Sequence, residues 1–313
     1  MRVVFVTHNR LGLACLEELV SAGADVEAVF TRPERDDISD QIDLAGFAER
    51  ESVELHRVDS LNDVSTRERI ASYDPEVLFV IGWSTLVDQA VIEIPSVAAL
   101  GMHPAPLPRG RGRAPIAWSL IKGLEETALS FFHLAPEADA GDLVGQEPIP
   151  IERDDDASSL YRRVVDAGRR LIRRHYPAFE EGSVPRTPQD ESRATWWPKR
   201  EPKDGLVDWT CEPNAIYDWI RGQTHPYPGA YTYLDDQRVT LWSANPPTGG
   251  PRFVVPGEIV SFDEPVLEIG AWEGTVELTR IGVSGREVPA SALVTEYEYD
   301  VGQAFEAASD GGW

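Results

Sequence analysis

The residues best suited to chemistry gather around His103. It follows the apolar run VAAL, which predicts a short buried strand, and precedes PAPLP, whose prolines fix backbone torsions and stiffen the loop. Open α/β sheets bind ligands beyond the carboxyl ends of their strands, where this histidine would lie. Because imidazole exchanges protons near neutral pH, we interpret His103 as a candidate acid–base group. The alternative, a structural role, is the commoner one for a lone histidine.

A possible partner for this histidine lies in the segment EADAGD, which follows a second apolar run, LSFFHLA, and carries Asp139 and Asp142. A carboxylate beside His103 would orient the imidazole and stabilise its positive charge. In so acidic a chain the same segment is equally typical of an ordinary acidic turn, and the residues alone leave both interpretations open.

The first half of the chain alternates short apolar runs with helical patterns. Strands are predicted at 2–7, 26–31, 53–58 and 76–82, and helices at 42–50 and 64–73. This alternation indicates an α/β domain built on a parallel sheet. The first turn, THNRLG, lacks the G-x-G-x-x-G spacing that a dinucleotide pyrophosphate needs, which disfavours a nicotinamide-binding protein.

The second half has a different pattern. A long helix is predicted over 157–180, followed by the polar, proline-containing segment GSVPRTPQDESRAT, which resembles a linker. Beyond it come a short helix at 214–222 and five strand-like runs punctuated by Gly and Pro, as in a small antiparallel barrel: AYTYL, RVTLWSA, GEIVSF, VLEIGAW and TVELTRIGV. We therefore predict two domains, 1–190 and 191–313.

Composition suggests the chain's surroundings. The 313 residues carry a net charge of −24, and only three of the 29 basic residues are lysines. An acid-rich, lysine-poor surface is tolerable where salt screens self-repulsion, so we expect a halophilic protein, the alternative being an ordinary acidic one. The six histidines and two cysteines show no metal-ligand spacing. The sequence has neither a signal peptide nor a long apolar run, so we expect a cytoplasmic protein without membrane spans.

Two longer stretches resemble a known family. HPAPLPRGRGRAPIAWSLIKG, followed by EADAGDLVGQEPI, resembles the formyltransferases that use 10-formyltetrahydrofolate as co-substrate. WWPKREPKDGLVDW and IRGQTHPYPGAYT resemble the segment that opens the C-terminal domain of methionyl-tRNA and amino-sugar formyltransferases. The resemblance implies a Rossmann-like formyltransferase domain followed by a small OB-like antiparallel β-barrel. It also implies that an amine attacks the formyl carbon while His103 acts as acid and base, supported by Asp139.

The resemblance assigns further positions. It places Asn9 and Arg113 at the acceptor site and gives the folate pocket this set: Thr85, Leu86, Val87, Arg113, Ala135, Pro136, Glu137, Ala138 and Asp139. Trp83 is equally compatible with stacking on the pterin and with a place in the core. Gly101 departs from the family, which has an asparagine there as a donor to the formyl oxygen, and we expect Ser84, Asn9 or a water to replace it. Ala105 and Pro106 also stand where the family has a serine.

The acceptor stays open between several candidates. The motif RGRAP is closer to the pattern of the amino-sugar branch than to that of the tRNA branch, which is RGAAP. We therefore expect an amino-sugar nucleotide as the acceptor and keep initiator tRNA as the alternative. A protein that binds folate or formyl-sugar without turnover is a third reading. We expect Arg109 and Arg111 to be solvated loop charges, and the arginines of the 157–180 helix to pair with acids rather than with phosphate. The oligomeric state is not predicted.

Overall fold

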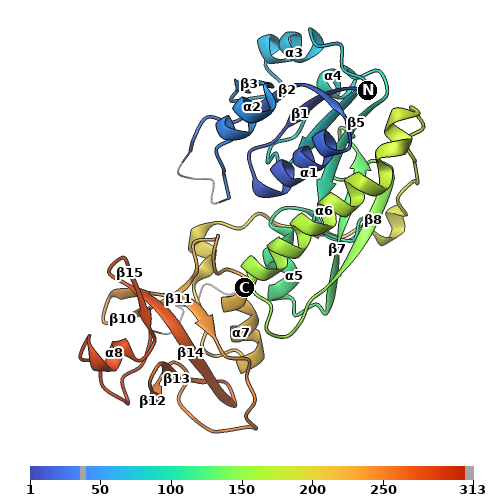
Figure 1. Cartoon of the computed structure of the whole chain (residues 1–313). Helices are drawn as coiled ribbons and strands as arrows, with labels where there is room; N and C mark the ends of the chain where they lie inside the picture. Colours follow the sequence, from blue (N-terminus) through green and yellow to red (C-terminus); the bar gives the residue numbers. More distant parts are fainter. Residues whose placement is uncertain (36–39, 307–313) are drawn as a thin grey trace. The chain divides into compact units, whose positions relative to one another are not determined.

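The computed structural model describes residues 1–35 and 40–306, and these form two compact units (Figure 1). The first unit comprises Met1–Pro115, Glu126–Pro150 and Tyr161–Pro198. The second comprises Ile116–Glu125, Ile151–Leu160 and the chain from Lys199 onward. The compact first unit thus extends to Pro198, while the predicted division at 190/191 stays a prediction.

A seven-stranded sheet forms the centre of the first unit, in the order β3-β2-β1-β4-β5-β7-β8. The strands are β1 (Arg2–Val6), β2 (Asp25–Thr31), β3 (Glu54–Arg57), β4 (Val77–Ile81), β5 (Ala98–His103), β7 (Glu126–His133) and β8 (Leu143–Pro150). The first five strands of this order pair in parallel, as the alternation of strands and helices in the sequence predicts. β7 then runs antiparallel to β5, and β8, antiparallel to β7, returns to the direction of the first five strands. The β7–β8 loop contains EADAGD.

Helices cover this sheet on both faces, in the usual three layers of an α/β domain. They are α1 (Arg10–Ser21), α2 (Ala45–Glu51), α3 (Val64–Ala71), α4 (Gln89–Ile92) and most of α6 (Ala157–Glu180). α5 (Pro115–Ile121) and the first turn of α6 group with the second unit. On one face Phe179 of α6 packs edge-on against Phe79 and Phe131. On the other, Ile70 of α3 and Val91 of α4 join an apolar cluster with Val4 and Leu78.

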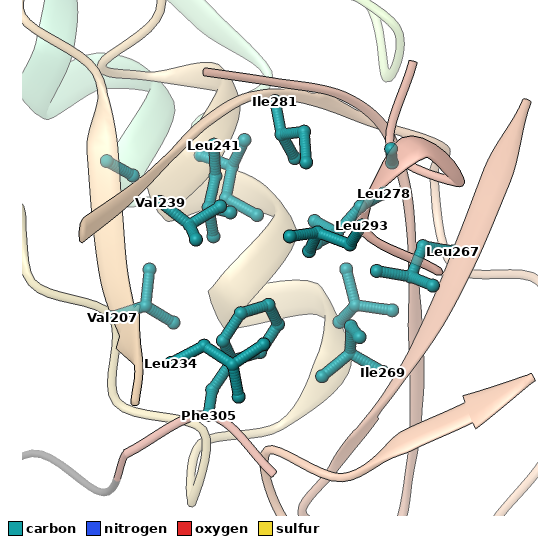
Figure 2. Close-up of a cluster of buried hydrophobic side chains, with 14 of the residues drawn as sticks. Val207, Leu234, Val239, Leu241, Leu267, Ile269, Leu278, Ile281, Leu293 and Phe305 are labelled. Atoms are coloured by element: carbon teal, nitrogen blue, oxygen red, sulfur yellow. The ribbon is translucent and has the colours of Figure 1, made fainter. Parts of the chain in front are cut away.

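The second unit is an antiparallel sheet whose path runs β10-β11-β14-β13-β12, with β15 added beside β14. Its elements are α7 (Pro213–Arg221), β10 (Ala230–Leu234), β11 (Gln237–Ala244), β12 (Ile259–Asp263), β13 (Val266–Ala271), β14 (Gly274–Val283), β15 (Arg286–Pro289) and α8 (Ala292–Thr295). Alternate residues of these strands, including Leu241, Ile269 and Ile281, meet Phe305 in one apolar core (Figure 2). The antiparallel C-terminal domain is confirmed.

A short pair of strands and two 3-10 turns complete the fold. The two-residue strand β6 (Arg111–Gly112) pairs in parallel with β9 (Trp196–Trp197), and the 3-10 turns η1 (Glu191–Arg193) and η2 (Pro202–Gly205) flank β9. None of the helices in the described part of the chain is long and apolar enough to cross a membrane.

Candidate active site

His103 is the last residue of β5 and is only 6% exposed. Its Nε2 lies 2.7 Å from the carbonyl oxygen of Gly110, in the loop that follows the strand. A carbonyl can only accept a hydrogen bond, so this contact places a proton on Nε2. Its Nδ1 lies 3.6 Å from Oδ2 of Asp139. The structure therefore brings together the two groups that the sequence put 36 positions apart.

Asp139 is fixed by backbone contacts of its own loop and its neighbour. Its φ is +56°, a left-handed conformation that aspartate tolerates better than most residues. Its Oδ2 accepts a hydrogen bond of 2.9 Å from the backbone N–H of Gly112. One carboxylate oxygen thus contacts both the histidine and the RGRGR loop, so the segment EADAGD is more than an acidic surface turn.

Arg111 corrects one prediction, because it is completely buried and not a solvated loop charge. Its guanidinium donates to both carboxylate oxygens of Glu191, at 2.6 and 2.9 Å. The hydrogen bond from Arg111 lowers the pKa of Glu191, whose side chain is 65% exposed. Burial of a charged guanidinium is unfavourable unless its donors are hydrogen-bonded, and the bidentate pair with Glu191 supplies such hydrogen bonds.

Gly101 lies in β5, two residues before His103, and is buried. A Cβ at this position would lie 2.8 Å from Cδ2 of Leu134, 3.3 Å from the Val80 carbonyl oxygen and 3.4 Å from Cζ of Phe132. A side chain at this position would therefore meet the end of the Leu134 side chain.

The three predicted folate-pocket residues after β4 lie in different environments. Oγ1 of Thr85 accepts a hydrogen bond from Arg32, at 3.1 Å. Leu86 is 62% exposed, whereas Val87 is buried in the apolar cluster beneath the sheet. Arg113 is exposed, and its Nη1 donates to the carbonyl oxygen of Ser84 at 3.1 Å. The structure thus joins the RGRGR loop to the β4 loop, as a shared pocket requires.

The other predicted pocket residues lie in the β7–β8 loop, beside the candidate catalytic pair. Pro136 and Glu137 are exposed, and the residues around them are half-buried: Ala135, Ala138 and Asp139. No residue from Ala135 to Asp139 is fully buried, although the carboxylate of Asp139 is held by the N–H of Gly112.

Asn9 has a structural role that the sequence prediction missed. Its Oδ1 accepts from the N–H of Gly12 and caps α1, and its Nδ2 donates to Asp40 at 3.2 Å. Both ends of the amide are therefore engaged. Its predicted contact with the acceptor stays a prediction.

His8 and Arg32 form a polar group with Trp83 that the sequence analysis did not single out. The Arg32 guanidinium lies 4.2 Å from the centre of the Trp83 ring, and the His8 ring meets the same indole edge-on at 5.8 Å. Burial lowers the pKa of His8. All three residues lie within two positions of the carboxyl ends of β1, β2 and β4, and that position is the signal that could have found them.

Four arginines in the second half of α6 are paired with acids, as predicted for that face of the helix. Arg170 and Arg174 share Glu147, at 2.8 and 2.7 Å, and their hydrogen bonds lower the pKa of that carboxyl against the opposing effect of burial. Arg169 pairs with Glu17, and Arg173 pairs with Glu18. Within residues 1–35 and 40–306, no cluster of three or more His, Cys, Asp or Glu side chains is arranged to hold a metal ion.

Comparison with known families matches both units. The model described as formyl transferase matches residues 1–175, and that described as formyl transferase, C-terminal domain, matches residues 199–297.

Solved structures share the fold at low sequence identity. HypX from Aquifex aeolicus in complex with tetrahydrofolic acid is 22% identical, with a TM-score of 0.69, over 96% of this chain and 48% of that one. This chain thus spans about half the length of HypX. An N-formyltransferase from Helicobacter canadensis, in complex with folinic acid and dTDP-3-aminofucose, is 13% identical, with a TM-score of 0.65 over 88% of this chain and 98% of that one. Methionyl-tRNA formyltransferase from Clostridium thermocellum is 15% identical, with a TM-score of 0.58 over 78% and 93%.

Proposed function

Because the chain belongs to the formyl transferase family, as the sequence resemblance predicted, we propose that it transfers a formyl group from 10-formyltetrahydrofolate to an amine. The observation that carries this proposal is the buried pair of His103 and Asp139, 3.6 Å apart at the carboxyl end of β5. Relatives of the same fold have been solved with tetrahydrofolic acid and with folinic acid, which supports a folate co-substrate.

The geometry suggests how protons move in this reaction. Nε2 of His103 donates to Gly110, so the lone pair of the neutral ring is on Nδ1, beside Asp139. The amine nitrogen attacks the formyl carbon, a C–N bond forms, and Nδ1 takes the amine proton while Asp139 stabilises the imidazolium. The tetrahedral intermediate then collapses, the bond from carbon to N10 of the folate breaks, and the imidazolium returns the proton to N10.

We infer that the acceptor is a small anionic amine, an amino-sugar nucleotide. Arg109 is exposed and its guanidinium makes no hydrogen bond or ion pair within the described residues, so the loop after His103 offers a cation to a phosphate. The α6 arginines, by contrast, are committed to carboxylates, and this weighs against the polyanion tRNA. A relative bound to dTDP-3-aminofucose adds support at the level of the family.

The test is direct formylation of a panel of amino-sugar nucleotides and of initiator methionyl-tRNA. Mass spectrometry detects the product as a gain of one CO, and His103→Gln is the matched control because it keeps a polar side chain but cannot carry the proton. We expect transfer to at least one amino sugar, at high potassium chloride as well as low, consistent with a cytoplasmic, salt-adapted protein. Transfer to tRNA alone would overturn the choice of acceptor.

One observation favours a second candidate, a protein that binds folate without turnover. Gly101 supplies no side-chain donor where the resemblance expects an asparagine, and loss of one oxyanion donor typically slows turnover by about 10²–10³. If wild type and His103→Gln bind 5-formyltetrahydrofolate equally and neither yields product with any acceptor, this second function replaces the first.

A further inference from the structure

The chain after α6 returns to the active site and runs beside both of its loops. Thr195 accepts from the backbone N–H of Gly110 through Oγ1 and from that of Arg111 through its carbonyl oxygen, each at 2.9 Å. Thr187 exchanges two backbone hydrogen bonds with Leu143, where β8 begins. One segment, 187–197, therefore contacts both the loop after His103 and the strand that follows the Asp139 loop.

Gln189, within this segment, is the residue that reaches Asp139. Its Nε2 donates to the carbonyl oxygens of Asp139 and Gly141, at 2.7 Å each. Its Oε1 accepts from Nη2 and Nε of Arg111, at 2.8 and 3.2 Å. Carbonyls only accept and a guanidinium only donates, so the orientation of this amide is fixed by its four contacts.

Arg111 is in turn held from the other side. It is fully buried, and its remaining donors engage the two oxygens of Glu191. The relay thus runs from Glu191 through Arg111 and Gln189 to the backbone of Asp139. Asp139 is in the left-handed region, a conformation that persists only where surrounding contacts impose it.

We propose that Gln189, oriented by Arg111, is a positioning residue that sets the placement of Asp139 against His103. The two carbonyl contacts hold the turn of the Asp139 loop, and the turn aims the carboxylate at Nδ1 of His103. Gln189 touches neither histidine nor substrate and acts through the loop alone. The proposal rests on the proposed formyl transfer for its kinetic readout.

The test compares variants that change hydrogen bonding with little change in size. Gln189→Glu keeps an acceptor for Arg111 but turns a second oxygen toward the carbonyls of Asp139 and Gly141, which repel it. Gln189→Met removes both sets of hydrogen bonds. Arg170→Gln is the matched control, since Arg170 is an exposed arginine of α6 paired with Glu147. We expect kcat to fall roughly 10–100-fold in both Gln189 variants, with KM for formyl-folate within about threefold of wild type.

A second readout does not depend on activity. In ¹⁵N-histidine-labelled protein the ring signals of His103, assigned through their loss in His103→Gln, should shift in Gln189→Glu and stay in place in Arg170→Gln. If Gln189→Glu fails to fold, Glu191→Gln at the exposed end of the relay takes its place, with a smaller shift expected. Wild-type kcat together with unmoved His103 signals would overturn the proposal. Moved signals in a protein that formylates nothing would contradict the proposed function and leave the positioning role standing.

Discussion

The packing of Leu134 against Gly101 gives the sharpest prediction about catalysis. From the sequence alone, Gly101→Asn would be expected to restore the donor that related enzymes carry. The backbone there is ordinary strand, so asparagine meets no torsional obstacle, but its Cβ would lie 2.8 Å from Cδ2 of Leu134. Overpacking of this kind costs about 1–3 kcal/mol, and an amide pressed against Leu134 and Phe132 adds about 1–3 kcal/mol if its hydrogen bonds are unmade.

We therefore expect Gly101→Asn alone to lower the free energy of unfolding without accelerating transfer. Removing the obstructing side chain in Gly101→Asn/Leu134→Ala gives the amide room. Relative to Leu134→Ala, which is the matched control, the double variant should turn over about 10²–10³ faster, corresponding to roughly 2.7–4 kcal/mol of transition-state stabilisation.

The measurement is a double-mutant cycle in both urea unfolding and formyl transfer. A single Gly101→Asn variant as stable as wild type would show that Leu134 moves aside freely. A double variant no faster than Leu134→Ala would show that the amide has no part in this active site, and either outcome refutes the reasoning.

Four further predictions test other features of the structure. Asp139→Asn keeps an acceptor for Gly112 and tolerates the positive φ but removes the charge beside His103, so kcat should fall about 10²–10⁴-fold with little change in melting temperature; retention of wild-type kcat would contradict the assigned role. Asn9→Ser keeps the helix cap, so a raised KM for the acceptor without loss of stability would indicate that Asn9 contacts the substrate. Asn9→Ala removes the cap and should lower the free energy of unfolding by about 1 kcal/mol, as measured by chemical unfolding. Burial lowers the pKa of His133 and His175 below their ordinary 6.5, so the unfolded chain binds more protons than the folded one. The free energy of unfolding should therefore fall as the pH drops from about 7 to 5.5. His175→Leu should reduce this dependence on pH, and an unchanged dependence would show that His175 takes no part. Burial also raises the pKa of the Cys15 thiol, so iodoacetamide should label Cys15 only after denaturation, as intact mass of Cys211→Ser would report.

Much of the fold could be predicted because its signals are local. Runs such as VLFVI reveal a strand buried on both faces, and the helix over 157–180 has the predicted limits. The reversed direction of β7 could not be predicted, because Leu129 and Phe131 would be equally apolar in a parallel strand. Strand direction is decided by where the chain turns, not by the side chains within a strand.

Part of the candidate site could also be predicted from the sequence, and part could not. His103 and Asp139 were found by residue type and by family pattern, and the structure places them in contact. The burial of Arg111 could not be predicted, because it depends on Gln189 and Glu191, which lie about eighty positions later in a segment that resembled a linker. The contact between Leu134 and Gly101 was missed for a similar reason, because the sequence does not show that β7 pairs with β5.

The location of Gln189, Glu191 and Thr195 has a practical consequence for anyone who divides this chain. A fragment that stops where the long helix ends, at Glu180, would carry every residue with a role in the proposed reaction but would lose the contacts that Gln189, Glu191 and Thr195 make. Truncations intended to isolate the N-terminal unit should therefore extend through Pro198, the last residue of its compact fold.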